Sequence, residues 1–215
     1  TKDLFNCENK YLLPLFEGAE YPWEILPKIK DYIKELISGG LEGFTEISDG
    51  VFVGNGVEIS PTATIEPPAI IGKGTTLRPG AYLRGNVICG EGCVIGNSTE
   101  LKNCILLSKA QVPHYNYVGD SVLGYKAHLG AGAITSNVKS DKTLVKVNVG
   151  DEKIETGLKK FGAMVGDNVE VGCGSVLNPG TVIGKNSNVY PLYSVRGFVP
   201  HNSIYKCKGE IAEKY

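Results

Sequence analysis

The sequence predicts an all-β chain wound as a parallel β-solenoid, and three observations support this fold class. Apolar residues recur at every sixth position over long stretches, and glycine often follows them. The 215 residues include 28 glycines, roughly double the average share, without a Gly-X-Y period. A period of six fits neither a helix nor simple strand alternation. It does fit a coil of three six-residue units, in which each unit forms one short strand and one turn. Successive coils then stack on one another, and their strands pair in parallel.

The repeat sets the bounds of the predicted coil at 51–199. Glycine directly after the inward apolar residue is expected to relieve crowding at a corner, where backbone angles are unusual. The apolar positions at six-residue spacing are Val53, Ile59, Ile65, Ile71, Leu77, Leu83, Cys89, Ile95 and Leu101, then Leu123 and Leu129, then Val165, Val171, Leu177, Ile183, Val189 and Val195.

Residues 1–50 do not repeat and are expected to form an N-terminal helical cap segment. Within 22–40, apolar residues fall on one helical face and charged residues on the other. Pro27 suits the start of this helix, and Gly39-Gly40 suits its end. We expect the helix to cover the open end of the solenoid, with a partner-binding helix as the alternative. Residues 200–215 are polar, and we expect a C-terminal tail that packs outside the coil or frays.

Two segments break the six-residue count and are predicted as loop insertions, near 107–117 and at 138–161. Solenoids accept insertions at corners, and loops carry function more often than coils do. His114, one of three histidines, lies in the first segment beside a proline and two tyrosines. These segments are therefore the first places to search for chemistry.

Charge and composition argue against several classes of partner. The formal net charge is −1 and the sequence pI is about 6.3, so neither nucleic acid nor an anionic membrane is favoured. No transmembrane-length apolar run and no basic-then-apolar leader occurs, so we expect a cytoplasmic protein. No C-x2-C pair occurs, so free and mostly buried thiols are expected rather than zinc or disulfides. The cysteines are Cys7, Cys89, Cys93, Cys104, Cys173 and Cys207.

Four stretches follow one another in the predicted coil: LRPGA at 77–81, GNSTELKN at 96–103, VPHYNYVGD at 112–120 and LGAGAITSN at 129–137. With the repeat, they resemble the hexapeptide-repeat acyltransferases, and in particular the acetyltransferase domain of the bacterial bifunctional uridyltransferase/glucosamine-1-phosphate acetyltransferase. The resemblance implies a left-handed parallel β-helix and a homotrimer with sites between subunits. It also implies transfer of an acyl group from acetyl-CoA, or another acyl-CoA, to an amino-sugar phosphate or a nucleotide-linked amino sugar, with no metal.

The residue types in these stretches agree with such a reaction. Attack of an amine on a thioester needs a base to accept the ammonium proton, and histidine is the usual choice near neutral pH. The developing oxyanion needs a hydrogen-bond donor. A sugar phosphate needs cations, and arginine offers a bidentate grip.

Eight positions match motif positions that carry function in the resembled family. The catalytic positions are His114, as general base, and Asn137. The substrate-binding positions are Arg78, Lys102 and Tyr117 at the sugar phosphate and Lys142 in the acceptor region. The cofactor-binding positions beside the acyl-CoA arm are Ala131 and Cys173.

Three departures from the family pattern concern the acceptor and oxyanion groups. Val138 replaces a tyrosine after Asn137, and His128 replaces an asparagine that contacts sugar. Cys173 aligns with a serine that stabilises the tetrahedral intermediate, and a thiol is a weaker donor than a hydroxyl. Residues 1–50 hold no Gly-rich phosphate loop after a strand, so we expect no nucleotidyltransferase activity from this chain.

Alternative explanations stay open, a purely structural role for each residue and other functions for the whole chain. His114 has an alternative as a turn residue satisfied by backbone groups, and Arg78 and Lys102 have one as solvated corners. A non-catalytic solenoid that binds sugar nucleotides and partners a separate nucleotidyltransferase is the second functional hypothesis. A metalloenzyme of the γ-carbonic anhydrase type is the third; it needs three converging histidines, and the histidine spacing here does not resemble that family's.

Overall fold

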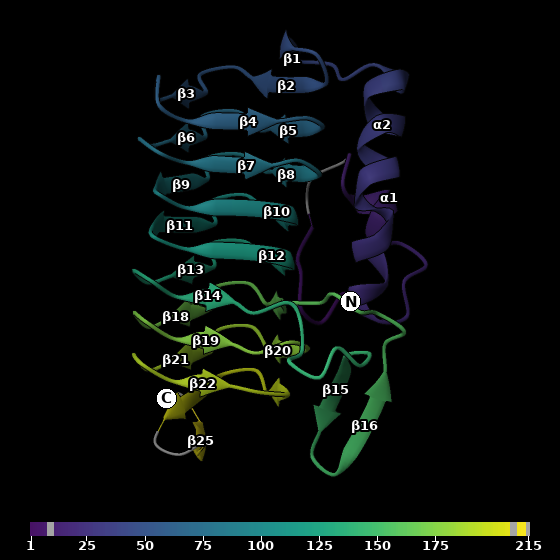
Figure 1. Cartoon of the computed structure of the whole chain (residues 1–215). Coiled ribbons are helices and arrows are strands. Elements are labelled where there is room, and N and C mark those ends of the chain that lie inside the picture. The colour runs from purple at the N-terminus through teal and green to yellow at the C-terminus, as the bar shows by residue number, and fades with distance from the viewer. Residues whose placement is uncertain (8–10, 207–209, 214–215) are drawn as a thin grey trace.

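A computed structural model, which describes residues 1–7, 11–206 and 210–213, confirms the predicted parallel β-solenoid (Figure 1). Each coil contributes three short strands, and strands of successive coils pair in parallel along the axis. Val51 lies beside Ala69 and Ala69 beside Val87, a step of 18 residues per coil. That step is three of the six-residue units found in the sequence, so the periodicity and the register agree.

The coils build three faces. The first face holds β3 (Glu58–Ile59), β6 (Thr76–Leu77), β9 (Val94–Asn97), β11 (Gln111–His114), β13 (His128–Leu129), β18 (Glu170–Val171), β21 (Asn188–Val189) and β24 (Ser203–Lys206). The second holds β4 (Thr64–Glu66), β7 (Tyr82–Arg84), β14 (Ile134–Thr135), β19 (Val176–Leu177) and β22 (Ser194–Val195). The third holds β2 (Val51–Gly54), β5 (Ala69–Ile71), β8 (Val87–Cys89), β17 (Ala163–Val165), β20 (Thr181–Ile183) and β23 (Phe198–Val199). Two longer strands, β10 (Glu100–Leu106) and β12 (Tyr117–Leu123), bend from the second face into the third.

The inward residues of the repeat form the core of the coil. Ile71, Leu83 and Ile95 are fully buried in a single apolar cluster. The glycine that follows an inward residue is required by close approach of the next coil. A Cβ on Gly72 would lie 2.5 Å from the carbonyl carbon and oxygen of Gly90. An apolar residue followed by glycine in the sequence therefore marks a position where the backbones of two successive coils are in contact.

The expected insertion near 107–117 is wrong. Residues 111–114 form β11, which pairs with β9 and β13, so this stretch belongs to the regular coil. Cys104 lies beside Ser121, a step of 17 residues rather than 18. Each of the coils that carry β10 and β12 has one unit of five residues instead of six, because these strands turn their corner one residue early. The six-residue count is broken here by a deletion, not by a loop.

The second expected insertion, at 138–161, coincides with a segment that leaves the coil. His128 pairs with Glu170, 42 residues away, whereas Glu170 pairs with Asn188 at the ordinary step. The extra residues form an antiparallel hairpin of β15 (Lys146–Val149) and β16 (Glu152–Glu155) outside the coil (Figure 1). Val145 and Val147 are buried and fix the hairpin to the solenoid.

The N-terminal helix is confirmed, but its predicted place is wrong. A short helix α1 (Leu13–Phe16) and a 3₁₀ helix η1 (Pro22–Lys28) precede α2 (Ile29–Gly39), which ends at Gly40 with a positive φ of 83°. Figure 1 shows α2 running along the side of the coil rather than over its end. Ile29 and Ile33 are fully buried in a second apolar cluster. The coil residues of that cluster point outward from the third face: Ile70, Ile88, Ile105, Leu107, Val122, Met164 and Val182.

The two ends of the coil differ. At the N-terminal end, Val53, Ile59 and Ile65 are only partly buried, and β1 (Phe44–Ser48) pairs antiparallel with β2. At the C-terminal end the tail prediction is wrong for 200–206. There β24 pairs with β21 and Tyr205 closes the core, while β25 (Glu210–Glu213) pairs antiparallel with β24. The rest of the predicted tail includes 207–209 and 214–215, outside the described residues.

Three of the thiols are buried in the coil, as predicted. Cys89, Cys93 and Cys104 are free and fully buried, and burial raises the pKa of Cys93 to about 12. Cys7 is partly buried, Cys173 is exposed, and Cys207 lies outside the described residues. None of the helices in the described ranges has the length and hydropathy needed to cross a membrane.

Candidate functional site

His114 lies on the corner between the first and second faces, where successive coils form a backbone ladder. At this corner the amide of one coil donates to a carbonyl of the coil before it. Tyr115 donates to Asn97 at 2.9 Å, Gly132 donates to His114 at 3.0 Å, and Gly174 donates to Ala131 at 2.9 Å. We call Asn97, His114, Ala131 and Cys173 the His114 corner. Its rungs are about 4.8 Å apart, the spacing of paired strands, so Ala131 and Cys173 lie one and two rungs from His114.

The main chain of His114 is held firmly while its ring is free. The backbone N–H donates to Asn116 Oδ1 at 3.1 Å, and the side chain is exposed. Within the described ranges, no hydrogen bond or ion pair reaches the imidazole. The alternative of a turn histidine satisfied by backbone groups therefore fits the main chain but not the ring.

Asn116 was not singled out in the sequence, although it sits in the same motif. Its side chain is buried, and its Nδ2 donates to the carbonyls of Gly130 and Ala133 at 2.8 and 2.9 Å. Asn116 thus ties the turn after His114 to the next coil. The sequence cue for Asn116 is weak, because a polar residue between two tyrosines in a segment predicted as a loop is not expected to be buried.

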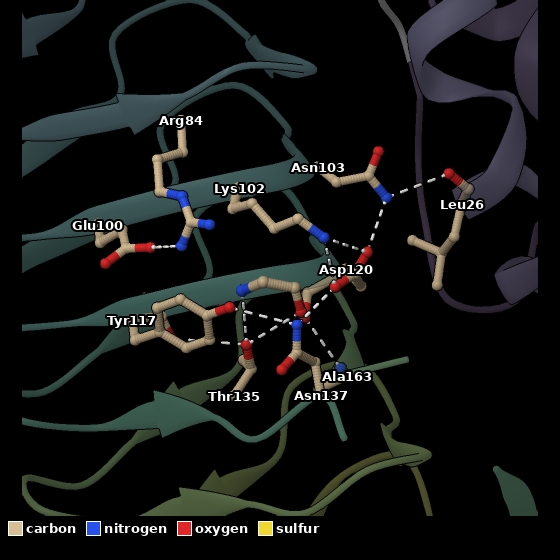
Figure 2. A network of polar contacts seen from close by, with 12 residues as sticks. Leu26, Arg84, Glu100, Lys102, Asn103, Tyr117, Asp120, Thr135, Asn137 and Ala163 are labelled. Atoms are coloured by element: carbon tan, nitrogen blue, oxygen red, sulfur yellow. Dashed lines mark hydrogen bonds and ion pairs between the residues drawn. The ribbon is translucent and has the colours of Figure 1, made fainter. Parts of the chain in front are cut away.

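Three predicted residues meet at the corner between the second and third faces (Figure 2). Lys102 Nζ lies 3.1 Å from each oxygen of Asp120. Asn137 Nδ2 donates to Asp120 Oδ2 and, at 3.2 Å, to the Tyr117 hydroxyl. Asn103 Nδ2 donates to Asp120 Oδ1 at 2.9 Å. We call Lys102, Asn103, Tyr117, Asp120 and Asn137 the Asp120 cluster.

The bends of β10 and β12 create this cluster. Asn103 and Asp120 have positive φ values of 47° and 48°, a conformation that Asn and Asp tolerate better than most residues. The bend turns the Asp120 carboxylate into a site where its side chain is 6% exposed, against 22% for Lys102. Asn103 also donates to the carbonyl of Leu26 in η1 at 3.3 Å, so the N-terminal segment touches the cluster.

The Tyr117 hydroxyl is kept protonated. Burial, with the charges of Asp120 and Glu100 as smaller contributions, raises the pKa of Tyr117 above its usual value. Because the hydroxyl oxygen accepts from Asn137, its hydrogen is available to donate elsewhere. Beside it on the second face, Arg84 is paired with Glu100 at 2.6 Å.

The predicted site residues thus fall into two groups at opposite edges of the second face. His114, Ala131 and Cys173 share one corner, with Arg78 two coils before His114 on the same edge. Lys102, Tyr117 and Asn137 share the other corner. Among the described residues, no ion pair joins Arg78 or Lys142 to either group. Lys142 is exposed in the insertion.

The departures from the family pattern also have defined places. Val138 is 44% exposed where the chain leaves the coil. His128 faces outward, as predicted, and its Nδ1 lies 2.7 Å from Glu170. Cys173 presents an exposed thiol on the His114 corner. The described part of the chain contains no group of three His, Cys, Asp or Glu side chains arranged to hold a metal ion.

Comparison with known proteins identifies relatives. Residues 75–156 match the family described as GMPPB C-terminal domain, and residues 50–85 match the bacterial transferase hexapeptide family. The chain is 34% identical over 196 residues to the bifunctional protein GlmU of Methanococcus aeolicus, covering 90% of this chain and 47% of that protein. The chain therefore spans about half the length of such bifunctional relatives.

A second relative is matched over most of both chains. The chain is 34% identical over 166 residues to an uncharacterized acetyltransferase, YaiX, of Escherichia coli K12, covering 77% of this chain and 72% of that protein. A point mutant of AntD, an N-acyltransferase from Bacillus cereus, has a TM-score of 0.44 at 16% identity, covering 81% and 91% of the two chains. That likeness is too low for a comparison of sites. The hexapeptide match and the extended identity to YaiX agree with the observed coil, and the chain belongs to the hexapeptide-repeat transferases.

Proposed function

We propose that this protein is an acyl-CoA-dependent N-acyltransferase that acetylates an amino-sugar phosphate or a nucleotide-linked amino sugar. The observation that carries the proposal is the free, exposed imidazole of His114 on a backbone-anchored corner. Relatives named as acetyltransferases, and as the bifunctional protein GlmU, support the same reaction class. Acetyl-CoA would be a co-substrate, and the proposed reaction uses no metal.

The reaction assigns a task to each group. The amine nitrogen attacks the thioester carbonyl, a C–N bond forms, the C–S bond breaks and CoA leaves as the thiol. His114 would accept the proton lost by the amine, since imidazole is suited to proton transfer near neutral pH. Ala131 and Cys173, further along the same corner, would border the acyl-CoA arm. Cys173 would be a weak donor to the oxyanion, because a thiol donates poorly.

The Asp120 cluster would hold the acceptor. Lys102 supplies a cation, Tyr117 a neutral hydroxyl donor and Asn137 an amide, all at one corner. Such a set suits a phosphate and sugar hydroxyls, because cationic and hydroxyl donors both bind phosphate oxygens. Arg78, on the His114 edge, would grip the phosphate from the other side, and Lys142 would complete the acceptor region.

We further propose that the complete site lies between copies in a homotrimer. In one chain His114 and Asn137 occupy opposite edges of the second face, so neither group alone offers both base and acceptor contacts. In a ring of three copies, the His114 corner of one chain would meet the Asp120 cluster of the next. Such heterologous contacts close a ring when the rotation is right.

Turnover is the direct test of the proposed reaction. Purified protein is incubated with acetyl-CoA and a panel of amino sugars that starts with glucosamine 1-phosphate and includes nucleotide-linked amino sugars, while free CoA is followed. We expect CoA release that depends on one acceptor and stops without it. Saturable binding of a sugar nucleotide without turnover across the panel would instead select the non-catalytic binding module.

Subunit complementation tests where the site is built. His114→Ala and Asn137→Ala chains are each expected to be nearly inactive. Co-expressed in equal amounts, they should regain activity, because about one quarter of the interfaces in random trimers join two intact contributions. Light scattering checks that the mixed assembly is a trimer. A mixture no more active than the sum of its parts would place both residues in one chain's own site.

A further inference from the structure

A small cavity lies between the inner side of the β15–β16 hairpin and the third face of the coil (Figure 1). The N-terminal segment and the start of η1 form its other two walls. Its volume is about 260 Å³, just below the roughly 300–1,000 Å³ of typical small-molecule sites. We call it the Trp23 cavity. No residue of the His114 corner or of the Asp120 cluster lines it, so it is separate from the proposed acyl-transfer site.

The inside of the Trp23 cavity is apolar. Val147 lies opposite Ile154 in the hairpin, so both side chains point to its inner face. Val182 and Phe198 are partners on adjacent strands of the third face, and they line the cavity from the coil. All four belong to the second apolar cluster or pack against it. The cavity is therefore a gap in the apolar layer between hairpin and coil, suited to an apolar body.

The wall at η1 is aromatic and carries an unused hydrogen-bond donor. Tyr21 stacks on Trp23, with ring centroids 4.7 Å apart and an interplanar angle of 8°. Trp23 is only 4% exposed, yet its indole N–H makes no hydrogen bond to any residue that the structure describes. A donor on so buried a side chain normally has a partner. A ligand in the cavity that presents an acceptor would supply one.

The side chains at the rim of the cavity are acidic. Asp3 and Glu20 are exposed, and within the described ranges no ion pair reaches either carboxylate. Neither lysine nor arginine lines the cavity. His201 adds no positive charge in this arrangement, because its Nδ1 accepts the backbone N–H of Lys185 at 3.0 Å, as only a neutral imidazole can. The rim therefore favours a cation and disfavours a phosphate or a carboxylate.

Hydrogen bonds hold the N-terminal wall in place. Asp167, which is 2% exposed, accepts the backbone N–H of Asn6 at 2.7 Å and donates its own N–H to the Leu4 carbonyl at 3.1 Å. The Thr1 hydroxyl donates to the carbonyl of Ala19 at 3.1 Å. These bonds fix the segment against the coil and against the chain that leads into η1. The cavity is thus preformed, as small-molecule sites usually are.

We propose that the Trp23 cavity binds a small organic amine with an aromatic body. The body would fill the apolar gap between hairpin and coil, and an acceptor on it would take the indole N–H of Trp23. The ammonium group would lie at the rim beside Asp3 and Glu20, where charge-assisted hydrogen bonds are available. The ring of Tyr21 can add a cation–π contact. Binding at this site does not depend on the acyl-transfer reaction.

Titration of the whole chain with three probes of one shape tests the site. Trp23 is the only tryptophan of the chain, so its fluorescence reports on the cavity, and calorimetry gives the affinity. The probes are tyramine, its neutral isostere tyrosol and the anion hydroxyphenylpropionate. We expect tyramine to bind saturably and at least about threefold more tightly than tyrosol, because the two differ only in the charged group. The anion should bind more weakly than either.

Two variants locate the binding. Asp3→Asn/Glu20→Gln should lower the affinity for tyramine to that for tyrosol and leave tyrosol unchanged. Ile154→Trp fills the cavity and should weaken both. Asp31→Asn/Glu35→Gln is the matched control, an exposed aspartate and glutamate on α2 that do not line the cavity. It should bind like the wild type, and circular dichroism should show all variants folded alike.

The proposal and the acyl-transfer reaction fail separately. The variant His114→Ala should bind tyramine like the wild type, whether or not the wild type turns over. Absence of saturable tyramine binding up to about 10 mM, the weak limit for so small a ligand, would overturn the proposal. Equal affinities for tyramine and tyrosol in the wild type, or unchanged tyramine binding in either cavity variant, would overturn it as well.

Discussion

Replacing His114 with alanine is expected to lower kcat/KM for acetyl transfer by about 10²–10⁴-fold, the usual contribution of a positioned general base. The fold should not be affected by this substitution. The imidazole has no partner within the described chain, so its removal leaves no buried group unsatisfied. The main chain at 114 stays anchored by Asn116 and Gly132. The free energy of unfolding should therefore change by less than about 0.5 kcal/mol.

Steady-state release of CoA and denaturant unfolding measure the two quantities on the same samples. Gln111→Ala is the control, because Gln111 is an exposed residue on the same strand, three positions before the histidine. It should retain wild-type kinetics. If His114→Ala turns over within about threefold of the wild type, well below a general base's contribution, His114 is not the base.

The coil was predictable because its determinant is local. An inward residue at every sixth position and a glycine where backbones touch are both visible in one dimension, and both are seen at Ile71 and Gly72. The position of the N-terminal helix along the side of the coil was not predicted, because the six-residue count considered only the inward-facing residues. Residues just before them, such as Ile70 and Ile88, form an apolar stripe on the outside. That stripe, rather than the open end, is what the helix buries.

The two groups of site residues were foreseen unequally. Family motifs named His114, Lys102 and Asn137, but a motif order does not say which residues share a corner. The shortened unit between Leu101 and Leu106 shifts the six-residue count, so the stretch that follows, near 107–117, is predicted as a loop. That prediction hid the burial of Asn116, in the turn after β11, and of Asp120, within β12. Asp120 ends the motif that drew attention to His114, yet its contacts come from two neighbouring coils. Asp120 and its partners meet only because the pairing register of the successive coils places them at one corner.

Asp120→Asn is expected to have the second largest effect, because it removes the charge at the centre of the Asp120 cluster and keeps the shape. Lys102 would lose its ion partner in a site where the carboxylate is 6% exposed. The new amide would also turn a donor toward Asn103 or Asn137, whose own amides donate there. We expect a loss of about 2–4 kcal/mol in the free energy of unfolding and at least about a tenfold lower kcat/KM.

Stability and activity can be separated by a second change in the same pair. Lys102→Met/Asp120→Asn removes the uncompensated cation, so it should recover part of the free energy of unfolding while acetyl transfer stays low. Asp167→Asn is the matched control. Asp167 is 2% exposed, pairs with Lys185 at 3.3 Å and accepts from Asn6, far from both site corners. It should lose comparable stability without a matching loss of kcat/KM. If the two carboxamide variants lose kcat/KM equally, Asp120 supports only the fold; a larger loss for Asp120→Asn means that its charge positions Lys102 and Asn137 for the acceptor.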